Sequence, residues 1–227
     1  MNKIGIDDNE IFLKLIKFRE LILEWNEKIN LTTITNEEEM YIKHFIDSYL
    51  LLNYDFNFKN KRVLDLGTGA GFPGIPLSLV MKNTEFCLLD SLNKRINFLK
   101  IVIKELNIKN VNLIHGRAED YAKQNEYRRR FDYVISRAVA DLPILVEYAL
   151  PFLKIGGYFI AYKGKNYSDE IKRSSNALDL LGGEIVDTLH YNLPIIYDDR
   201  YFIIIKKTKD TPFRYPRKAG KVTKNPL

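Results

Sequence analysis

Residues 62–76 read RVLDLGTGAGFPGIP, and this stretch decides the fold. Its first part, Val63–Leu66, is mostly apolar and is predicted to form a short strand that carries Asp65 near its end. Glycine then recurs through the following loop, at Gly67, Gly69, Gly71 and Gly74. Glycine lets the backbone turn with positive φ and approach a ligand closely, and the helix beyond offers free N–H groups at its N-terminus. A strand, an acidic residue and a glycine loop in this order are typical of a nucleotide-cofactor site.

Strands and helices alternate along the chain after this loop. Helices are predicted over residues 73–81, 92–106, 142–153 and 168–181. Strands are predicted over residues 63–66, 86–89, 111–115, 132–136, 158–162, 184–191 and 201–205. This alternation predicts an α/β fold with a seven-stranded, mostly parallel sheet and helices on both faces. No helix separates the last two strands, so they are expected to form a hairpin with the last strand antiparallel.

The chain is expected to have three parts. Residues 1–60 are predicted to form a helical lobe, with an amphipathic helix over about 8–28 and a second helix ending near residue 52. A capping box, either Thr35 with Glu38 or Asn36 with Glu39, would begin that second helix. Residues 61–207 would form the cofactor-binding domain, and residues 208–227 a basic tail. Prolines argue against a helix in this tail, at Pro212, Pro216 and Pro226.

Composition argues against several other classes of protein. No run of about 18 apolar residues is present, so no membrane span is expected, and the N-terminus MNKIGIDDNE does not resemble a signal peptide. The single cysteine, Cys87, excludes an internal disulfide framework and a paired-cysteine zinc site. The spacing of the histidines indicates no metal site. These features favour the cytoplasm, and the sequence does not indicate an oligomeric state.

Positive charge is concentrated at the C-terminal end. Residues 206–227 hold eight basic residues and one acidic residue, whereas the rest of the chain carries 27 basic and 28 acidic residues. A basic tail is either a solvated end or a contact for a polyanion, because lysine and arginine supply affinity for phosphates. Phe213 and Tyr215 lie among these charges and could stack on bases.

Two classes of cofactor fit the glycine loop. Residues 69–74 match the GxGxxG pattern of dinucleotide oxidoreductases. Asp65 favours S-adenosylmethionine, because a carboxylate directly before the loop would face a cationic methionine amine better than a pyrophosphate. Asp90 ends the next strand and can accept hydrogen bonds from the ribose hydroxyls of either cofactor.

Ala118 and Glu119 add to the case for S-adenosylmethionine. They follow the third predicted strand, where a methyltransferase reads the adenine. All of these residues lie at carboxyl ends of strands, where open α/β sheets bind ligands. The sequence therefore predicts a Rossmann-like class I S-adenosylmethionine-dependent methyltransferase fold.

The order of motifs resembles the glucose-inhibited division protein B (RsmG) family over nearly the whole chain. The matching segments are Asn30-Leu31-Thr32, the run HFIDS at 44–48, the run DLGTGAGFPGIP at 65–76, Asp90-Ser91-Leu92 with Lys94-Arg95, Ser136-Arg137-Ala138 and the run YPRKAG at 215–220. That family methylates N7 of one guanine, conventionally numbered 527, in bacterial 16S ribosomal RNA. The resemblance implies S-adenosylmethionine as cofactor, with contacts at Gly67, Phe72, Ala118, Glu119 and Arg137, and 16S RNA or the small ribosomal subunit as partner.

The residues allow direct, in-line methyl transfer without a covalent intermediate. Guanine N7 carries an exposed lone pair and needs no general base, so alignment of the reactants is the main task. Cys87 lies inside a predicted strand and is expected to be a small buried residue, not a nucleophile. Arg137 follows the fourth strand, where its guanidinium could donate to a guanine or a phosphate, and is the candidate catalytic residue.

Basic residues near the predicted site are candidates for RNA contact. They are Lys94, Arg95, Lys163, Arg217 and Lys218. His44 and Asp47 lie three residues apart on one helical face and could pair, and residues 128–130 (RRR) are expected to form a solvated turn. A small-molecule methyltransferase, an NAD-dependent oxidoreductase and an RNA-binding module without catalysis remain alternative functions.

Overall fold

The computed structural model, which describes residues 8–227, is built around one seven-stranded sheet with the order β3-β2-β1-β4-β5-β7-β6. The strands are β1 (Arg62–Leu66), β2 (Glu85–Asp90), β3 (Val111–His115), β4 (Phe131–Arg137), β5 (Leu153–Lys163), β6 (Gly183–Leu193) and β7 (Asp198–Lys207). Neighbours from β3 to β5 pair in parallel, and β7 runs antiparallel to both β5 and β6. The predicted seven-stranded sheet with an antiparallel last strand is confirmed.

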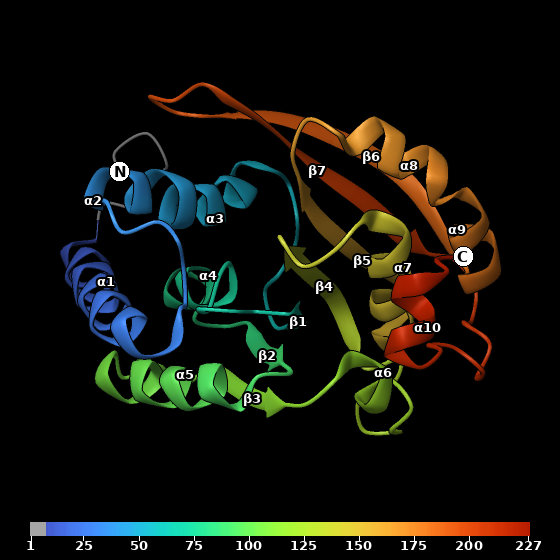
Figure 1. The fold of residues 1–227 in the computed structure, drawn as a ribbon, viewed down its shortest axis with the longest axis horizontal. Coiled ribbons are helices and arrows are strands. Elements are labelled where there is room, and N and C mark those ends of the chain that lie inside the picture. Colours follow the sequence, from blue (N-terminus) through green and yellow to red (C-terminus); the bar gives the residue numbers. More distant parts are fainter. Residues whose placement is uncertain (1–7) are drawn as a thin grey trace.

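Helices cover both faces of this sheet, with α1 to α5 on one side and α6 to α10 on the other (Figure 1). The first group comprises α1 (Asn9–Ile29), α2 (Glu37–Met40), α3 (Asp47–Tyr49), α4 (Gly74–Val80) and α5 (Asn93–Glu105). The second comprises α6 (Ala118–Tyr121), α7 (Leu142–Ala149), α8 (Tyr167–Arg173), α9 (Ser175–Leu181) and α10 (Ala219–Lys224). Among residues 8–227, no helix is long and apolar enough to cross a membrane.

The strands divide their side chains between two hydrophobic clusters. In β4, Tyr133 and Ile135 belong to the cluster under α1, α4 and α5, whereas Val134 between them belongs to the cluster under α7 and α9. This alternation follows from the two-residue period of a strand. Because both faces of the central strands are buried, β1 and β2 read as mainly apolar runs, whereas the edge strand β6 is largely exposed.

The N-terminal helices share the first cluster with the sheet. Phe18 of α1 is fully buried, and its ring centre lies 5.3 Å from that of Phe72 in the glycine loop. It also stacks against Phe98 of α5 at 6.4 Å. The helical lobe therefore packs directly on the segment that carries the glycine loop, although the three-part division of the chain remains a prediction.

The second predicted helix is present but is not uniform. Asn36 caps it by accepting from the backbone N–H of Glu39, which is one half of the second capping alternative, whereas the Glu39 carboxylate pairs with Lys43. The run continues from α2 through a π-helical turn at Tyr41–Ile46 and α3, and ends in a 3-10 turn at Leu50–Asn53. A π-helical turn often occurs at a functional site, and this one carries His44.

Two expectations were wrong, one about the C-terminal tail and one about Arg128, which contacts it. A short helix, α10, is present in the tail. Pro216 and Pro226 do not prevent it, because they lie outside the helix and proline disrupts only a helix interior. In the run at 128–130, Arg129 and Arg130 are exposed as expected, but Arg128 is buried. Its guanidinium donates to the carbonyl oxygens of Ala122, Thr211 and Tyr215. These bonds fasten the tail to the body of the protein.

Candidate active site

The glycine loop between β1 and α4 has a conformation that other residues would not adopt readily. Gly67, Gly69 and Gly71 all have positive φ, at 72°, 62° and 101°. A Cβ atom at Gly67 would lie 2.5 Å from Cγ2 of Val139, and one at Gly71 would lie 2.7 Å from Cγ1 of Ile75. The loop is therefore specified by its glycines, both by backbone conformation and by space.

Asp65 lies beneath this loop and holds it in place. One carboxylate oxygen accepts from the Thr68 hydroxyl at 2.7 Å and from the Gly74 N–H at 2.9 Å. Its other oxygen is buried and has no hydrogen-bond partner within the described part of the chain. Burial raises the pKa of Asp65 to about 6. The structure thus shows Asp65 bracing the loop, with one acceptor left over for a donor.

A cavity of about 450 Å³ lies over the loop, at the carboxyl ends of β1, β2 and β4. Its volume falls within the roughly 300–1,000 Å³ typical of cofactor and ligand sites. The predicted site residues that line it are Gly67, Gly69, Phe72, Asp90, Arg95 and Arg137. The lining also includes residues that were not predicted as site residues, among them Leu31, Thr32, His44, Ser91, Ala138 and Val139. The only sequence signal for Leu31, Thr32 and His44 was that they lie in two of the segments that match the family, residues 30–32 and 44–48.

Asp90 connects the loop to the next helix. Its carboxylate accepts from the Gly69 N–H at 2.9 Å, the Leu92 N–H at 2.8 Å and the Arg95 guanidinium at 3.2 Å. The residue is only 2% exposed, yet it lines the cavity. A carboxylate has about four acceptor sites, so one remains for a ligand hydroxyl.

Four predicted cofactor contacts lie outside the immediate lining of this cavity, at Asp65, Gly71, Ala118 and Glu119. The last two begin α6 and are buried, and Glu119 pairs with Arg117 at 3.7 Å. The N–H of Gly116, which leads into α6, donates to the Asp90 carbonyl at 3.0 Å. Ala118 and Glu119 thus follow β3 at the same edge of the sheet as Asp90.

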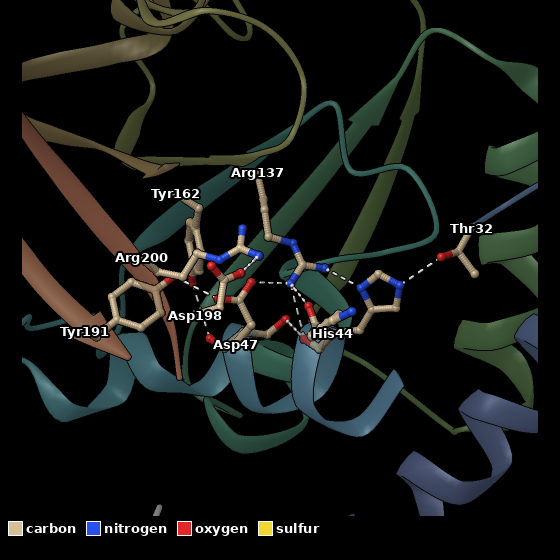
Figure 2. A network of polar contacts seen from close by, with 10 residues as sticks. Thr32, His44, Asp47, Arg137, Tyr162, Tyr191, Asp198 and Arg200 are labelled. Atoms are coloured by element: carbon tan, nitrogen blue, oxygen red, sulfur yellow. Dashed lines mark hydrogen bonds and ion pairs between the residues drawn. The ribbon is translucent and has the colours of Figure 1, made fainter. Parts of the chain in front are cut away.

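Arg137, at the end of β4, joins the sheet to the helical lobe (Figure 2). Its Nη1 donates to Asp47 Oδ2 at 2.7 Å and to the Lys43 carbonyl at 3.1 Å. Its Nη2 faces Nδ1 of His44 at 3.3 Å, and the guanidinium carbon lies 5.1 Å from the Phe72 ring centre. The expected His44–Asp47 pair does not form; instead, both side chains contact Arg137.

The contacts of His44 determine its tautomer. Arginine only donates, so Nδ1 must accept, and Nε2 must carry the proton that it donates to Thr32 Oγ1 at 2.9 Å. The imidazole also stacks on Phe72, with ring centres 4.6 Å apart. Burial, together with the positive charge of Arg137, lowers the pKa of His44 to about 3. His44 is therefore a neutral wall of the cavity.

We expect this histidine to make folding sensitive to acid. Its pKa is about 3 when folded and 6.5 when exposed, so the unfolded chain binds more protons between these values. The free energy of unfolding should fall by up to about 1.4 kcal/mol per pH unit as pH drops below 6.5. Asp65 titrates in the opposite sense over part of this range, so urea unfolding should be compared between wild type and His44→Gln. Equal pH dependence in both proteins would contradict the assignment.

The predicted RNA contacts lie in different environments. Lys94 and Lys218 are exposed. Lys163 is largely buried, where it pairs with Glu170 at 2.5 Å and donates to the Ala140 carbonyl at 2.7 Å. Arg217 makes a two-pronged pair with the fully buried Glu147, at 2.9 and 2.6 Å. The five candidates are therefore not all free cations, because Lys163, Arg217 and Arg95 form ion pairs with carboxylates of the protein.

The fold and the site define a class I methyltransferase that uses S-adenosylmethionine. Solved structures of similar fold include a SAM dependent methyltransferase from Aquifex aeolicus, with a TM-score of 0.58 and 15% identity, over 79% of this chain and 97% of that one. Another is M. jannaschii TYW2 in complex with AdoMet, with a TM-score of 0.56 and 18% identity, over 72% of this chain and 76% of that one.

Sequence comparison places the chain more closely. The family model described as rRNA small subunit methyltransferase G matches residues 12–194. The ribosomal RNA small subunit methyltransferase G of Clostridium tetani is 49% identical over 99% of this chain and 93% of its own length. The protein of the same name from Desulfitobacterium hafniense is 50% identical over 92% of this chain and 87% of its own. The chain belongs to the rRNA small subunit methyltransferase G family.

Proposed function

We propose that this protein methylates N7 of a guanine in bacterial 16S ribosomal RNA, the guanine at position 527 by resemblance to its family. The observation that carries the proposal is the cavity over the glycine loop, which Arg137 and His44 close from the side of the helical lobe. The names of the relatives, which specify small-subunit ribosomal RNA, support the class of substrate. An NAD-dependent or small-molecule activity is not favoured, because the chain belongs to a family of RNA methyltransferases.

The residues around the loop fit S-adenosylmethionine. Gly67 and Gly69 let the backbone approach the ligand, and Asp90 keeps an acceptor site for a ribose hydroxyl. Asp65 has a buried oxygen without a partner among residues 8–227, which suits a nearby ammonium group. Ala118 and Glu119 would contact the adenine end. When bound, this cofactor supplies an electrophilic methyl group carried on a positively charged sulfur.

The chain itself needs chiefly to align the reactants. Guanine N7 is a nucleophile in its neutral form, so no general base is required, and His44 in its neutral form is not positioned as an acid. Cys87 is 3% exposed and burial raises its pKa to about 11, which argues against covalent catalysis through a thiolate. Methyl transfer moves the positive charge from sulfur to the purine and creates no net charge, and the Asp47 carboxylate is already paired with Arg137.

Methyl transfer to RNA tests the proposal directly. Purified protein should transfer label from S-adenosylmethionine to bacterial small ribosomal subunits or 16S RNA, with the label mapped to a guanine N7. We place this activity in the cytoplasm. Absence of label from both substrates, with the cofactor bound normally, would overturn the proposal.

The exposed lysines of the tail are expected to strengthen RNA binding through charge alone. Lys218, Lys221 and Lys224 are exposed on or beside α10. Replacing all three with glutamine should weaken RNA binding. Each lost phosphate contact lowers the slope of log affinity against log salt by roughly 0.7, so the slope should fall by about 2. The melting temperature should not change.

The matched control is Arg217→Gln. It removes one tail charge but leaves Glu147 buried without its partner, so the expected result is a stability loss of about 3–5 kcal/mol. A triple lysine variant that binds RNA with an unchanged salt slope would remove the tail from the RNA interface.

A further inference from the structure

A cavity lined by arginines lies at the opposite edge of the sheet from the cofactor site. Its volume is about 430 Å³, and its lining residues are Asn125, Arg128, Arg129 and Arg130. This arginine cavity directly precedes β4, whereas Arg137 of the cofactor cavity ends that strand. β4 has seven residues, so at about 3.3 Å per residue its two ends lie roughly 20 Å apart. The arginine cavity is therefore separate from the cofactor site.

Positive charge gathers around this cavity with little to balance it. The segments 123–130 and 207–214, which meet here, hold seven basic and two acidic residues. Arg129 pairs with Asp210 at 3.1 Å, but both side chains are more than half exposed, where an ion pair is worth little. Arg130 is exposed, and its Nε donates to the Asn125 carbonyl oxygen at 3.0 Å rather than to a carboxylate. Among the ion pairs of residues 8–227, one carboxylate thus serves the three arginines.

Lys207 adds a buried positive group next to Arg128, since both side chains bind Thr211. It is fully buried, and its Nζ donates to the Leu150 carbonyl oxygen at 2.9 Å and to the Thr211 hydroxyl. These partners satisfy its N–H groups without neutralising its charge. Burial, and next the positive charge of Arg128, lowers the pKa of Lys207 to about 7. The cations of this region therefore repel one another, and an anion bound in the cavity would relieve that repulsion.

An exposed aromatic ring lies beside the arginines. Phe213 is 67% exposed, and the guanidinium carbon of Arg128 lies 5.2 Å from its ring centre. Arg128 also donates to the carbonyl oxygens of Thr211 and Tyr215, so it fixes the tail on either side of Phe213. Cations beside an exposed aromatic ring are the combination that binds single-stranded nucleic acid, because the cations contact phosphates and the ring stacks on a base.

We propose that the arginine cavity and Phe213 bind a single-stranded segment of the ribosomal RNA, with a phosphate in the cavity and a base stacked on the ring. The inference rests on the proposed function for the identity of the RNA, and it adds a contact remote from the cofactor. A free phosphate compound would use the arginines but would leave Phe213 without a partner. Phosphate contacts and stacking carry little sequence information, so this site holds and orients the RNA and does not select the base.

The test measures binding of octauridylate, a single-stranded RNA, at several salt concentrations. The double variant Arg129→Gln with Arg130→Gln removes two candidate phosphate contacts. At roughly 0.7 per contact, the slope of log affinity against log salt should fall by about 1.4.

The matched control is the double variant Lys17→Gln with Lys104→Gln. It removes the same charge from two exposed positions on α1 and α5, which cover the other face of the sheet (Figure 1). Its salt slope should equal that of wild type. In methyl transfer to bacterial small ribosomal subunits, the arginine variant should show a higher KM for the subunit and an unchanged kcat, because the arginines lie far from the cofactor cavity.

Phe213→Leu separates stacking from charge. Leucine keeps an apolar side chain but has no ring face, so the affinity for octauridylate should fall about 5- to 150-fold, the range for one stacked base. The salt slope should not change. Octauridylate that contains 4-thiouridine should crosslink to the peptide that carries Phe213. All of the replaced side chains are exposed, so the melting temperatures should stay close to that of wild type.

Calorimetry with inorganic pyrophosphate distinguishes a free phosphate ligand from RNA. Pyrophosphate that binds as tightly as octauridylate, together with full octauridylate affinity in Phe213→Leu, would reassign the cavity to a free phosphate compound. An unchanged salt slope in the arginine variant, or an equal fall in the lysine control, would overturn the inference. The proposed function fails separately, if wild-type protein places no methyl group on a guanine N7.

Discussion

Replacing Arg137 with lysine is expected to lower the rate of methyl transfer about 100-fold, with much smaller changes in cofactor affinity and stability. The guanidinium of Arg137 donates to Asp47, to the Lys43 carbonyl and to His44 from a fixed planar fork. A lysine ammonium is a point charge, so it can pair with Asp47 but cannot hold the other two contacts in the same geometry. A displacement of about 1 Å at an active site can cost about 100-fold in rate, and loss of these two contacts lets the side chain shift by that order.

Arg137→Ala removes the structural role of this residue as well as its positioning role, so Arg137→Lys is the variant that separates the two. Alanine leaves Asp47 as a buried carboxylate without its cation, so we expect a stability loss of about 3–5 kcal/mol as well as loss of activity. The measurements are single-turnover methylation of small subunits, calorimetric binding of S-adenosylmethionine and thermal unfolding. If Arg137→Lys were folded and as active as wild type, Arg137 would have no place in the active site.

Gly69→Val is expected to weaken S-adenosylmethionine binding at least 100-fold. Gly69 lines the cofactor cavity, and a Cβ atom there would approach nothing closer than the Gly67 carbonyl oxygen at 4.0 Å. The valine side chain would therefore occupy space in the cavity itself. Its φ of 62° is also unfavourable for a β-branched residue, at a cost of about 1–2 kcal/mol.

Gly69→Ala is the graded control for this prediction. It carries the same backbone strain but only one methyl group, so it should lower stability similarly and cofactor affinity much less. Calorimetric titration with S-adenosylmethionine, alongside thermal unfolding, distinguishes filling of the cavity from damage to the loop. Unchanged affinity in the valine variant would show that the cofactor does not use this cavity.

The fold was accessible from the sequence because its signals are local. The segment from Arg62 to Pro76 shows a strand, an acid and a glycine loop within fifteen residues, and the alternation of apolar runs extends that unit to the whole sheet. The structure confirms the sheet, and the comparisons confirm the cofactor class and the family. The individual site residues remain predictions.

The detailed site was less accessible, because spacing does not show which side chains meet. His44 and Asp47 suggested a pair on one helix, yet both turn toward Arg137, about ninety residues away along the chain. Lys163 and Arg217 looked like free cations, but Glu170 and Glu147 neutralise them. Long-range pairing of this kind depends on how helices and strands pack.

By itself, the sequence determined the class of protein, since glycine spacing and hydrophobic periodicity act over a few residues and survive in any packing. Tertiary structure alone decided how the site is assembled. It brought Thr32 and His44 to the wall of one cavity, and it brought Arg137 and Arg200 to the wall of another. The physical reason is that the ends of β4, β6 and β7 lie together beside the helical lobe. Residues far apart in sequence therefore share buried hydrogen bonds there.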